Sequence, residues 1–98
     1  SALVQQVISE LIELRLLDDA RFEDALIQSK HRQGLGPFRI MKVLQKKSLP
    51  TEGVHEAIED AEWVNSMTTT WRKRFSAKPT DRKQYLQQAR YLQYRGFN

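Results

Sequence analysis

The 98-residue sequence contains no cysteine, only four glycines and three prolines, and no long apolar run. Without cysteine it can form neither a disulfide nor a thiolate nucleophile nor a sulfur-ligated metal site. No apolar stretch approaches the roughly 20 residues that a membrane-spanning helix needs. No signal peptide precedes the first apolar pattern. We therefore expect a cytoplasmic protein without a membrane segment.

Negative charge is nearly absent from the last third of the chain. Residues 1–62 carry 8 Lys or Arg and 11 Asp or Glu, whereas residues 63–98 carry 8 Lys or Arg and a single acidic residue, Asp81. An acidic first part and a basic last part predict two contact surfaces, one of which could face a polyanion. The alternative is that these charges lie on solvated helix faces.

Strand-like alternation is also absent, and apolar residues instead recur at three- and four-residue spacing. This spacing predicts an all-α chain of about six helices joined by short connections. The length suits one domain with a modest core. The expected helices cover residues 3–16, 19–33, 37–47, 51–61, 62–76 and 81–95.

Caps and helix breakers define the expected ends of these helices. Asp18 and Asp19 interrupt the first apolar pattern and can cap the second helix, and Thr80 is the expected cap of the last one. Gly34 is a good helix stop, and Pro37 fits the first turn of the next helix because that turn needs no amide donor there.

Large apolar residues recur every four positions in the expected 62–76 helix. They are Trp63, Met67, Trp71 and Phe75. We expect them to belong to the core. The alternative, a platform on which nucleic-acid bases stack, would require an exposure that this spacing does not favour.

Two segments resemble each other at a constant offset of 48 residues, namely residues 43–49 and 91–97. Each ends a helical pattern with a cation, a small residue and a large apolar residue. Gly96 is expected in a left-handed cap, with Phe97 folding back onto the helix. Ser48 takes the place of this glycine upstream, at a cost of about 1 kcal/mol if it adopts the same conformation. Such an internal repeat predicts a tandem array, and arrays of this kind mostly bind other molecules.

Four short motifs follow one another along residues 16–97. They read Leu16-Leu17-Asp18-Asp19-Ala20-Arg21-Phe22, Gly34-Leu35-Gly36-Pro37-Phe38-Arg39-Ile40, Leu44-Gln45-Lys46-Lys47-Ser48-Leu49 and Leu92-Gln93-Tyr94-Arg95-Gly96-Phe97. In this order and spacing they resemble the RecX family, the regulators of the RecA recombinase. Ser48 stands where that family has glycine, and residues 62–80 carry little of its signature.

Similarity to RecX implies tandem three-helix repeats in an elongated, curved helical array. On that basis residues 1–18 are the last helix of a preceding, missing repeat, residues 19–61 form one complete repeat, and residues 62–98 supply the first two helices of the next. Both ends are thus expected to be cuts through a longer chain.

The resemblance also implies a function in homologous recombination, DNA repair and the SOS response. The implied partners are RecA and its filament on single-stranded DNA, whose activities the protein would restrain, with at most weak direct contact to DNA.

Nothing in the sequence indicates an enzyme. His31 and His55 are isolated, without a second histidine at metal-ligand spacing. Gly34 and Gly36 lack the third glycine and the flanking strand of a nucleotide-binding loop. Serine, aspartate and histidine occur, but no spacing places them as a catalytic triad. We expect no catalytic residue, no metal site and no cofactor.

Polar and cationic residues form a stripe on two of the expected helices. On the 37–47 helix the stripe faces away from Ile40 and Leu44. Its members are Arg39, Lys42 and Lys46, and the 48-residue offset places Gln87, Arg90 and Tyr94 at the corresponding positions of the last helix, where Lys83 lies in line with them. An exposed tyrosine offers contact area at a low entropic cost. The two stripes could meet a repeating target, or they could be solvated faces without a partner.

A second basic cluster is expected around the connection between the last two helices. It comprises Arg72, Lys73, Lys78, Arg82 and Lys83. Contact with phosphates through this cluster would depend on salt and not on base sequence. An acidic patch on a protein partner would serve equally well.

Arg95 is expected to have a structural role. A cation near the C-terminus of its helix stabilises that end by about 0.3–1 kcal/mol.

Two functions stay open at this point. One is the non-enzymatic regulator that the resemblance implies, acting through an extended surface. The other is a helical module that binds DNA directly, because two helices joined across Gly34 and Pro37 superficially resemble a helix-turn-helix. Tight, salt-sensitive binding to naked DNA would favour the second function.

Overall fold

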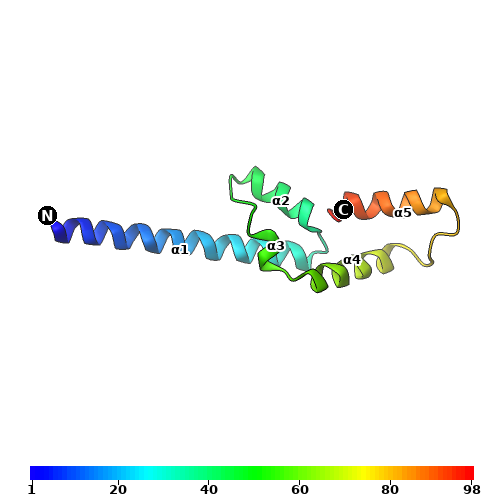
Figure 1. Cartoon of the computed structure of the whole chain (residues 1–98), viewed down its shortest axis with the longest axis horizontal. Coiled ribbons are helices and arrows are strands. Elements are labelled where there is room, and N and C mark those ends of the chain that lie inside the picture. Colours follow the sequence, from blue (N-terminus) through cyan, green and yellow to red (C-terminus); the bar gives the residue numbers. More distant parts are fainter.

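The computed structural model describes residues 1–98, which form five α-helices and no strand. The molecule measures 72 × 21 × 16 Å and has a radius of gyration of 19.0 Å, against about 13 Å for a compact domain of this size. The predicted fold class, an elongated all-α array, is confirmed (Figure 1). The helices are α1 (Ala2–Arg32), α2 (Pro37–Lys46), α3 (Val54–Ala57), α4 (Asp60–Arg74) and α5 (Arg82–Tyr94).

The helices lie in two rows along the long axis (Figure 1). α1 and α4 follow one another in the first row. α5 then returns alongside α4 and ends where α2 begins, so that α5 and α2 form the second row. Residues 33–36 connect α1 to α2, and residues 75–81 connect α4 to α5. These short connections place both rows side by side over the middle of the molecule.

A small core lies where α1, α2, α3 and the start of α4 meet. Its buried members are Ile27, Ile40, Leu44, Val54, Ile58, Trp63 and Phe97. Ile40 and Leu44 are four residues apart on α2, so they share the face that turns inward. Phe97 enters this core from the other end of the sequence and thereby ties the end of α5 to the centre.

One uninterrupted helix, α1, replaces the two helices expected at residues 3–16 and 19–33. The predicted break at Asp18 and Asp19 is wrong. Residues 2–32 contain neither glycine nor proline, and a continuous helix keeps the backbone hydrogen bonds that two extra helix ends would leave unpaired. Apart from half-buried Leu26, the large apolar side chains before Ile27 are exposed, including Leu3 and Phe22.

The helix expected at residues 51–61 is reduced to a single turn, α3. It stops because Ile58 is extended, with φ −127° and ψ 126°. Val54 and Ile58 are 0% and 1% exposed. Both side chains are therefore buried where the helix stops at Ala57. This turn still counts as a helix, so the expected total of six falls to five only because residues 3–16 and 19–33 share α1.

The cap of α5 is Asp81, so the prediction that Thr80 caps this helix is wrong. Asp81 Oδ1 accepts a hydrogen bond from Gln84 N at 2.7 Å. Gln84 Oε1 in turn accepts hydrogen bonds from Thr80 N and Thr80 Oγ1, both at 2.9 Å. The two side chains thus satisfy amide groups at the start of the helix reciprocally.

The end of α2 has the hydrogen-bonding pattern expected for a left-handed cap. Ser48 N donates to Gln45 O at 3.0 Å, and Leu49 N donates to Leu44 O at 2.9 Å. Ser48 has φ 57°, so it does adopt the left-handed conformation of the corresponding glycine. A residue other than glycine in this conformation carries a steric cost of about 1–2 kcal/mol.

The end of α5 repeats this arrangement 48 residues later. Gly96 N donates to Gln93 O and Phe97 N donates to Leu92 O, both at 3.0 Å. Gly96 has φ 103°, which confirms the predicted left-handed cap. The two helices therefore end in the same way, with Ser48 in the place of Gly96.

We expect Ser48→Gly to raise the free energy of unfolding by about 0.5–1 kcal/mol, because glycine adopts positive φ without a steric cost. Urea denaturation measures this change. Ser29→Gly is the matched control, since Ser29 lies inside α1, where glycine lowers stability by about 0.5–1 kcal/mol. A Ser48→Gly variant no more stable than the natural chain would contradict the expectation.

Candidate interaction surfaces

The end of α5 and the start of α2 meet end to end. Gly36 N donates to Arg95 O at 2.8 Å, and Phe38 N donates to Gly96 O at 3.0 Å. The first amides of a helix and the carbonyls at its end have no partner within their own helix, so each end here satisfies the other. As a result α5 and α2 behave as consecutive segments of one row (Figure 1).

Two glycines permit this close approach. A Cβ on Gly36 would lie 2.4 Å from the carbonyl carbon of Gly96. A Cβ on Gly96 would lie 2.4 Å from Arg39 Cβ and 2.6 Å from Arg39 N. Separations this short are repulsive, so the joint between the two helices requires glycine at both positions.

Arg39 and Tyr94 bring the polar stripes of α2 and α5 into contact. The guanidinium carbon of Arg39 lies 4.9 Å from the centre of the Tyr94 ring. Arg39 Nη1 also donates to Tyr94 O at 3.4 Å. The Tyr94 side chain remains 65% exposed. The stripes, predicted on separate helices, therefore meet at this pair.

The other members of the stripes extend in both directions from this contact. Lys42 and Lys46 are exposed farther along α2. Lys83, Gln87 and Arg90 line one hollow on α5. We call the whole surface the basic stripe; it comprises Lys83, Gln87, Arg90, Tyr94, Arg39, Lys42 and Lys46.

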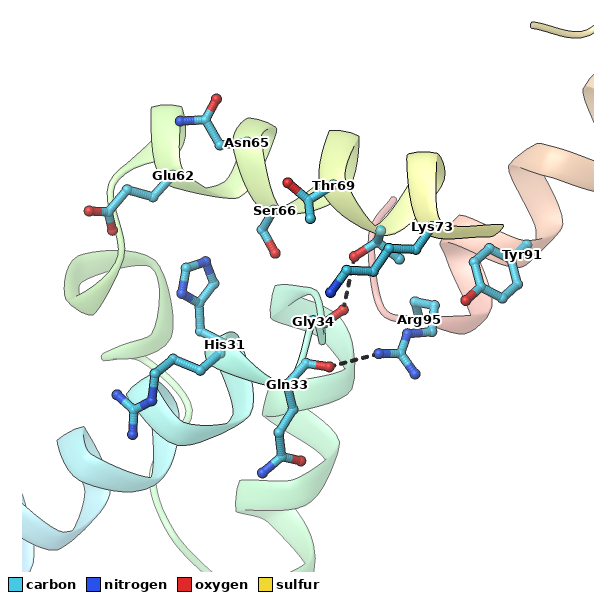
Figure 2. A pocket seen from close by; sticks show the side chains of 12 residues that line it. His31, Gln33, Gly34, Glu62, Asn65, Ser66, Thr69, Lys73, Tyr91 and Arg95 are labelled. Carbon is cyan, nitrogen blue, oxygen red and sulfur yellow. Dashed lines mark hydrogen bonds between the residues drawn. The ribbon is translucent and has the colours of Figure 1, made fainter. Parts of the chain in front are cut away.

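The second predicted cluster is divided among three surfaces. Arg72, Lys78 and Arg82 are exposed around the connection between α4 and α5, and Lys83 belongs to the basic stripe. Lys73 instead lines a groove beside the end of α1 (Figure 2).

Arg95 connects the end of α5 to the end of α1. The prediction placed its charge at the C-terminus of its own helix. Its Nη2 instead donates to Gln33 O at 2.8 Å, and Gln33 is the C-cap of α1. Arg95 therefore stabilises the end of another helix.

The core predicted for Trp63, Met67, Trp71 and Phe75 is confirmed in part: Met67 packs against the core that contains Trp63, whereas Trp71 and Phe75 pack against α5. Trp63 is 8% exposed and belongs to the core. Trp71 Nε1 donates to Gln88 Oε1 at 2.8 Å. Phe75 meets Tyr91 edge-on, with ring centres 5.6 Å apart. These contacts hold α4 and α5 together as a hairpin.

Sequence reasoning missed the groove that Lys73 lines, which we call the polar groove (Figure 2). It has a volume of about 470 Å³ and lies between the end of α1, one face of α4 and the last turns of α5. The α4 residues that line it are Glu62, Asn65, Ser66, Thr69, Thr70 and Lys73. Their three- and four-residue spacing is a signal that the sequence does contain, although it does not show what faces them.

The two histidines lie apart, His31 at the end of α1 and His55 in α3. The His31 ring packs edge-on against Trp63 at 5.0 Å. No group of three or more histidine, aspartate or glutamate residues is arranged to hold a metal ion. None of the five helices combines the length and the apolar character needed to cross a membrane.

Comparison with known proteins identifies similar chains. The family model described as "RecX, third three-helix domain" matches residues 60–98. The regulatory protein RecX of Halorhodospira halophila is 37% identical over 97 residues, which cover 96% of this chain and 60% of that protein. Its namesake from Acinetobacter baylyi is 34% identical over 96 residues, covering 97% of this chain and 60% of that protein. The regulatory protein RecX of Pseudomonas tolaasii is 31% identical over 99 residues, which cover 98% of this chain and 64% of that protein.

The chain therefore spans about three fifths of the length of these curated relatives. All three are named as regulatory proteins and not as enzymes. No solved structure matches the chain.

Proposed function

Since this chain belongs to the RecX family, we propose that it acts in the cytoplasm as a non-enzymatic regulator of the RecA recombinase. In this proposal it binds RecA and the filament that RecA forms on single-stranded DNA. The observation that carries the proposal is the basic stripe, which crosses from α5 to α2 through the contact between Arg39 and Tyr94.

The basic stripe suits a partner that presents acidic groups at regular intervals. α2 and α5 end in the same hydrogen-bonded cap 48 residues apart, so corresponding side chains occupy equivalent places on the two helices. A polymer with repeated acidic side chains or phosphates can then meet both helices at once, and the second contact forms at a high effective concentration.

Inhibition by such binding needs no chemistry from this chain. An array that contacts adjacent RecA subunits can occlude the DNA or hinder the exchange of subunits at the filament ends. Both effects would restrain recombination, repair of DNA and the SOS response.

We also propose that the helices form successive repeats. The end of α1, α2 and α3 pack against one another in pairs, so residues 19–61 would be a complete repeat. Residues 62–98, with α4 and α5, would begin the next one, because the family's third domain is matched there. Residues 1–18 would then close a preceding repeat, which accounts for exposed apolar side chains such as Val7 and Leu11.

The test is the single-stranded-DNA-dependent hydrolysis of ATP by RecA, measured as the full-length protein is added. We expect hydrolysis to fall severalfold and filament growth to slow as the protein approaches saturation. If both rates stay unchanged at saturating protein, the proposed function is excluded.

The basic charge of residues 63–98 also favours a second candidate, direct binding to DNA. It predicts high affinity for naked DNA and a steep loss of affinity as salt rises. The start of α2 argues against a helix-turn-helix mode, in which the first residues of the second helix contact bases. Here the amides of Gly36 and Phe38 are bonded to α5 and Pro37 is buried. Strong binding to the filament with weak binding to free DNA would favour the regulator.

A further inference from the structure

The polar groove has the properties of a binding site that is separate from the basic stripe. We infer that it binds an acidic peptide segment of a protein partner. This inference goes beyond the proposed function, because it assigns a second site with a different ligand.

Cationic side chains from three parts of the chain converge on the groove. Arg32 ends α1, Lys73 lies in the last turn of α4, and Arg95 follows α5. One carboxylate, that of Glu62, lines the same groove. The excess of positive charge favours an anionic ligand over a neutral or cationic one.

Two residues that line the groove each carry a buried side-chain nitrogen without a hydrogen-bond partner, namely Arg95 Nε and His31 Nε2. A buried polar atom in this state is unfavourable, so a ligand that supplies the missing partner gains affinity. The hydrogen bond from Arg95 Nη2 to Gln33 O fixes the guanidinium and leaves its Nε without an acceptor. A ligand carboxylate that reaches Nε would accept a charge-assisted hydrogen bond from it, and the exposed Lys73 lines the same groove.

The face of α4 that lines the groove carries short polar side chains. Figure 2 shows Ser66 and Thr69 on the side of α4 that faces His31 and Gly34. Hydroxyl groups both donate and accept hydrogen bonds, so they can adapt to the alternating groups of a peptide backbone. The face therefore suits an extended peptide that crosses the groove.

A nucleic acid fits the groove less well. The carboxylate of Glu62 and the carbonyls of Gln33 and Gly34, just after α1, disfavour a ligand with negative charge along its whole backbone more than one with charge only on its side chains. Tyr91, the one aromatic side chain besides His31 in the groove, is half-buried and packed against Phe75, so it offers no face for base stacking. A peptide carries carboxylates for the cations on its side chains and a neutral backbone between them.

The test is an NMR titration of the ¹⁵N-labelled chain with hexaglutamate. We expect saturable shifts of the Arg95 Nε–Hε signal and of the Gly34 and Thr70 amides. Lys73→Glu is expected to weaken the affinity about tenfold, because it reverses a charge inside the groove. The matched control, Arg72→Glu, reverses an exposed neighbouring charge that does not line the groove, and it is expected to change affinity by less than about twofold.

Three results would overturn the inference. The first is a titration in which only signals of the basic stripe shift, and the second is equal weakening by the two variants. The third is an oligothymidylate or inorganic phosphate that moves the same groove signals at the same concentration, since the groove would then be a phosphate site. Far-UV circular dichroism checks that both variants fold, as expected for exposed positions. The titration does not involve RecA, so it is independent of the test of the proposed function.

Discussion

Gly96→Ala is expected to lower the free energy of unfolding by about 2–4 kcal/mol and to separate the end of α5 from α2. The added Cβ would lie 2.4 Å from Arg39 Cβ and 2.6 Å from Arg39 N. Moving this backbone would stretch the hydrogen bond from Phe38 N to Gly96 O. The positive φ of residue 96 adds a steric cost of about 1–2 kcal/mol for alanine.

A companion variant isolates the effect of close approach. Gly36 has φ −81°, which any residue can adopt, but its Cβ would lie 2.4 Å from the carbonyl carbon of Gly96. We therefore expect Gly36→Ala to destabilise the protein as well. Gly53→Ala is the matched control, because φ is −77° and the nearest atom, Glu23 Oε1, is 3.5 Å away. Its effect is expected to stay within about 0.5 kcal/mol.

Urea denaturation measures the stability of these variants, and hydrogen exchange at the Gly36 and Phe38 amides reports on the joint itself. In Gly96→Ala both amides should exchange much faster than in the natural chain. Natural stability together with natural exchange protection would show that the joint tolerates a side chain.

Reversing four charges of the basic stripe is expected to weaken binding to the RecA filament about 100-fold, with unchanged helical content. The variant carries glutamate at Lys42, Lys46, Lys83 and Arg90. All four side chains are exposed, and they lie on both sides of the Arg39–Tyr94 contact. Their reversal would therefore repel an acidic partner along the whole stripe without removing a packing contact.

Filament binding and inhibition of ATP hydrolysis measure this effect, and circular dichroism checks the fold. The matched control compares two double variants that change net charge equally. One carries glutamate at Lys42 and Lys46 on the stripe, and the other carries glutamate at Arg15 and Arg21 on the exposed half of α1. We expect the first pair to weaken binding clearly and the second to change it less than about threefold. If the folded quadruple variant inhibits like the natural protein, the stripe has no part in binding.

Sequence reasoning succeeded where the local chemistry of one residue decides the backbone. Pro37 starts α2, as expected for a proline in a first helical turn, and Gly96 takes the positive φ predicted for its helix-ending cap. It failed at Asp18 and Asp19, because a possible cap competes with a helix that can simply continue. It also failed at Ile58, where the burial of one side chain accompanies an extended backbone.

The candidate sites, too, were predicted where local sequence decides and missed where the packing of distant segments decides. Helical periodicity was enough to group Arg39 with Lys42 and Lys83 with Arg90, because each pair shares a helix. Their joining through Tyr94 depends on the docking of residues 94–96 against residues 36–39, which no local pattern predicts. The polar groove was missed for the same reason, since three helices contribute to it.

The end-to-end joint of α5 and α2 has a mechanical consequence. Two backbone hydrogen bonds, from the amides of Gly36 and Phe38, join the helices directly, and the Arg39 side chain adds its contact with Tyr94. A force along the row therefore passes through stiff elements. The contacts of Trp71 with Gln88 and of Phe75 with Tyr91 also hold α5 alongside α4, so the connection at residues 75–81 is braced. α2, α5 and α4 should then resist bending as one stiff unit.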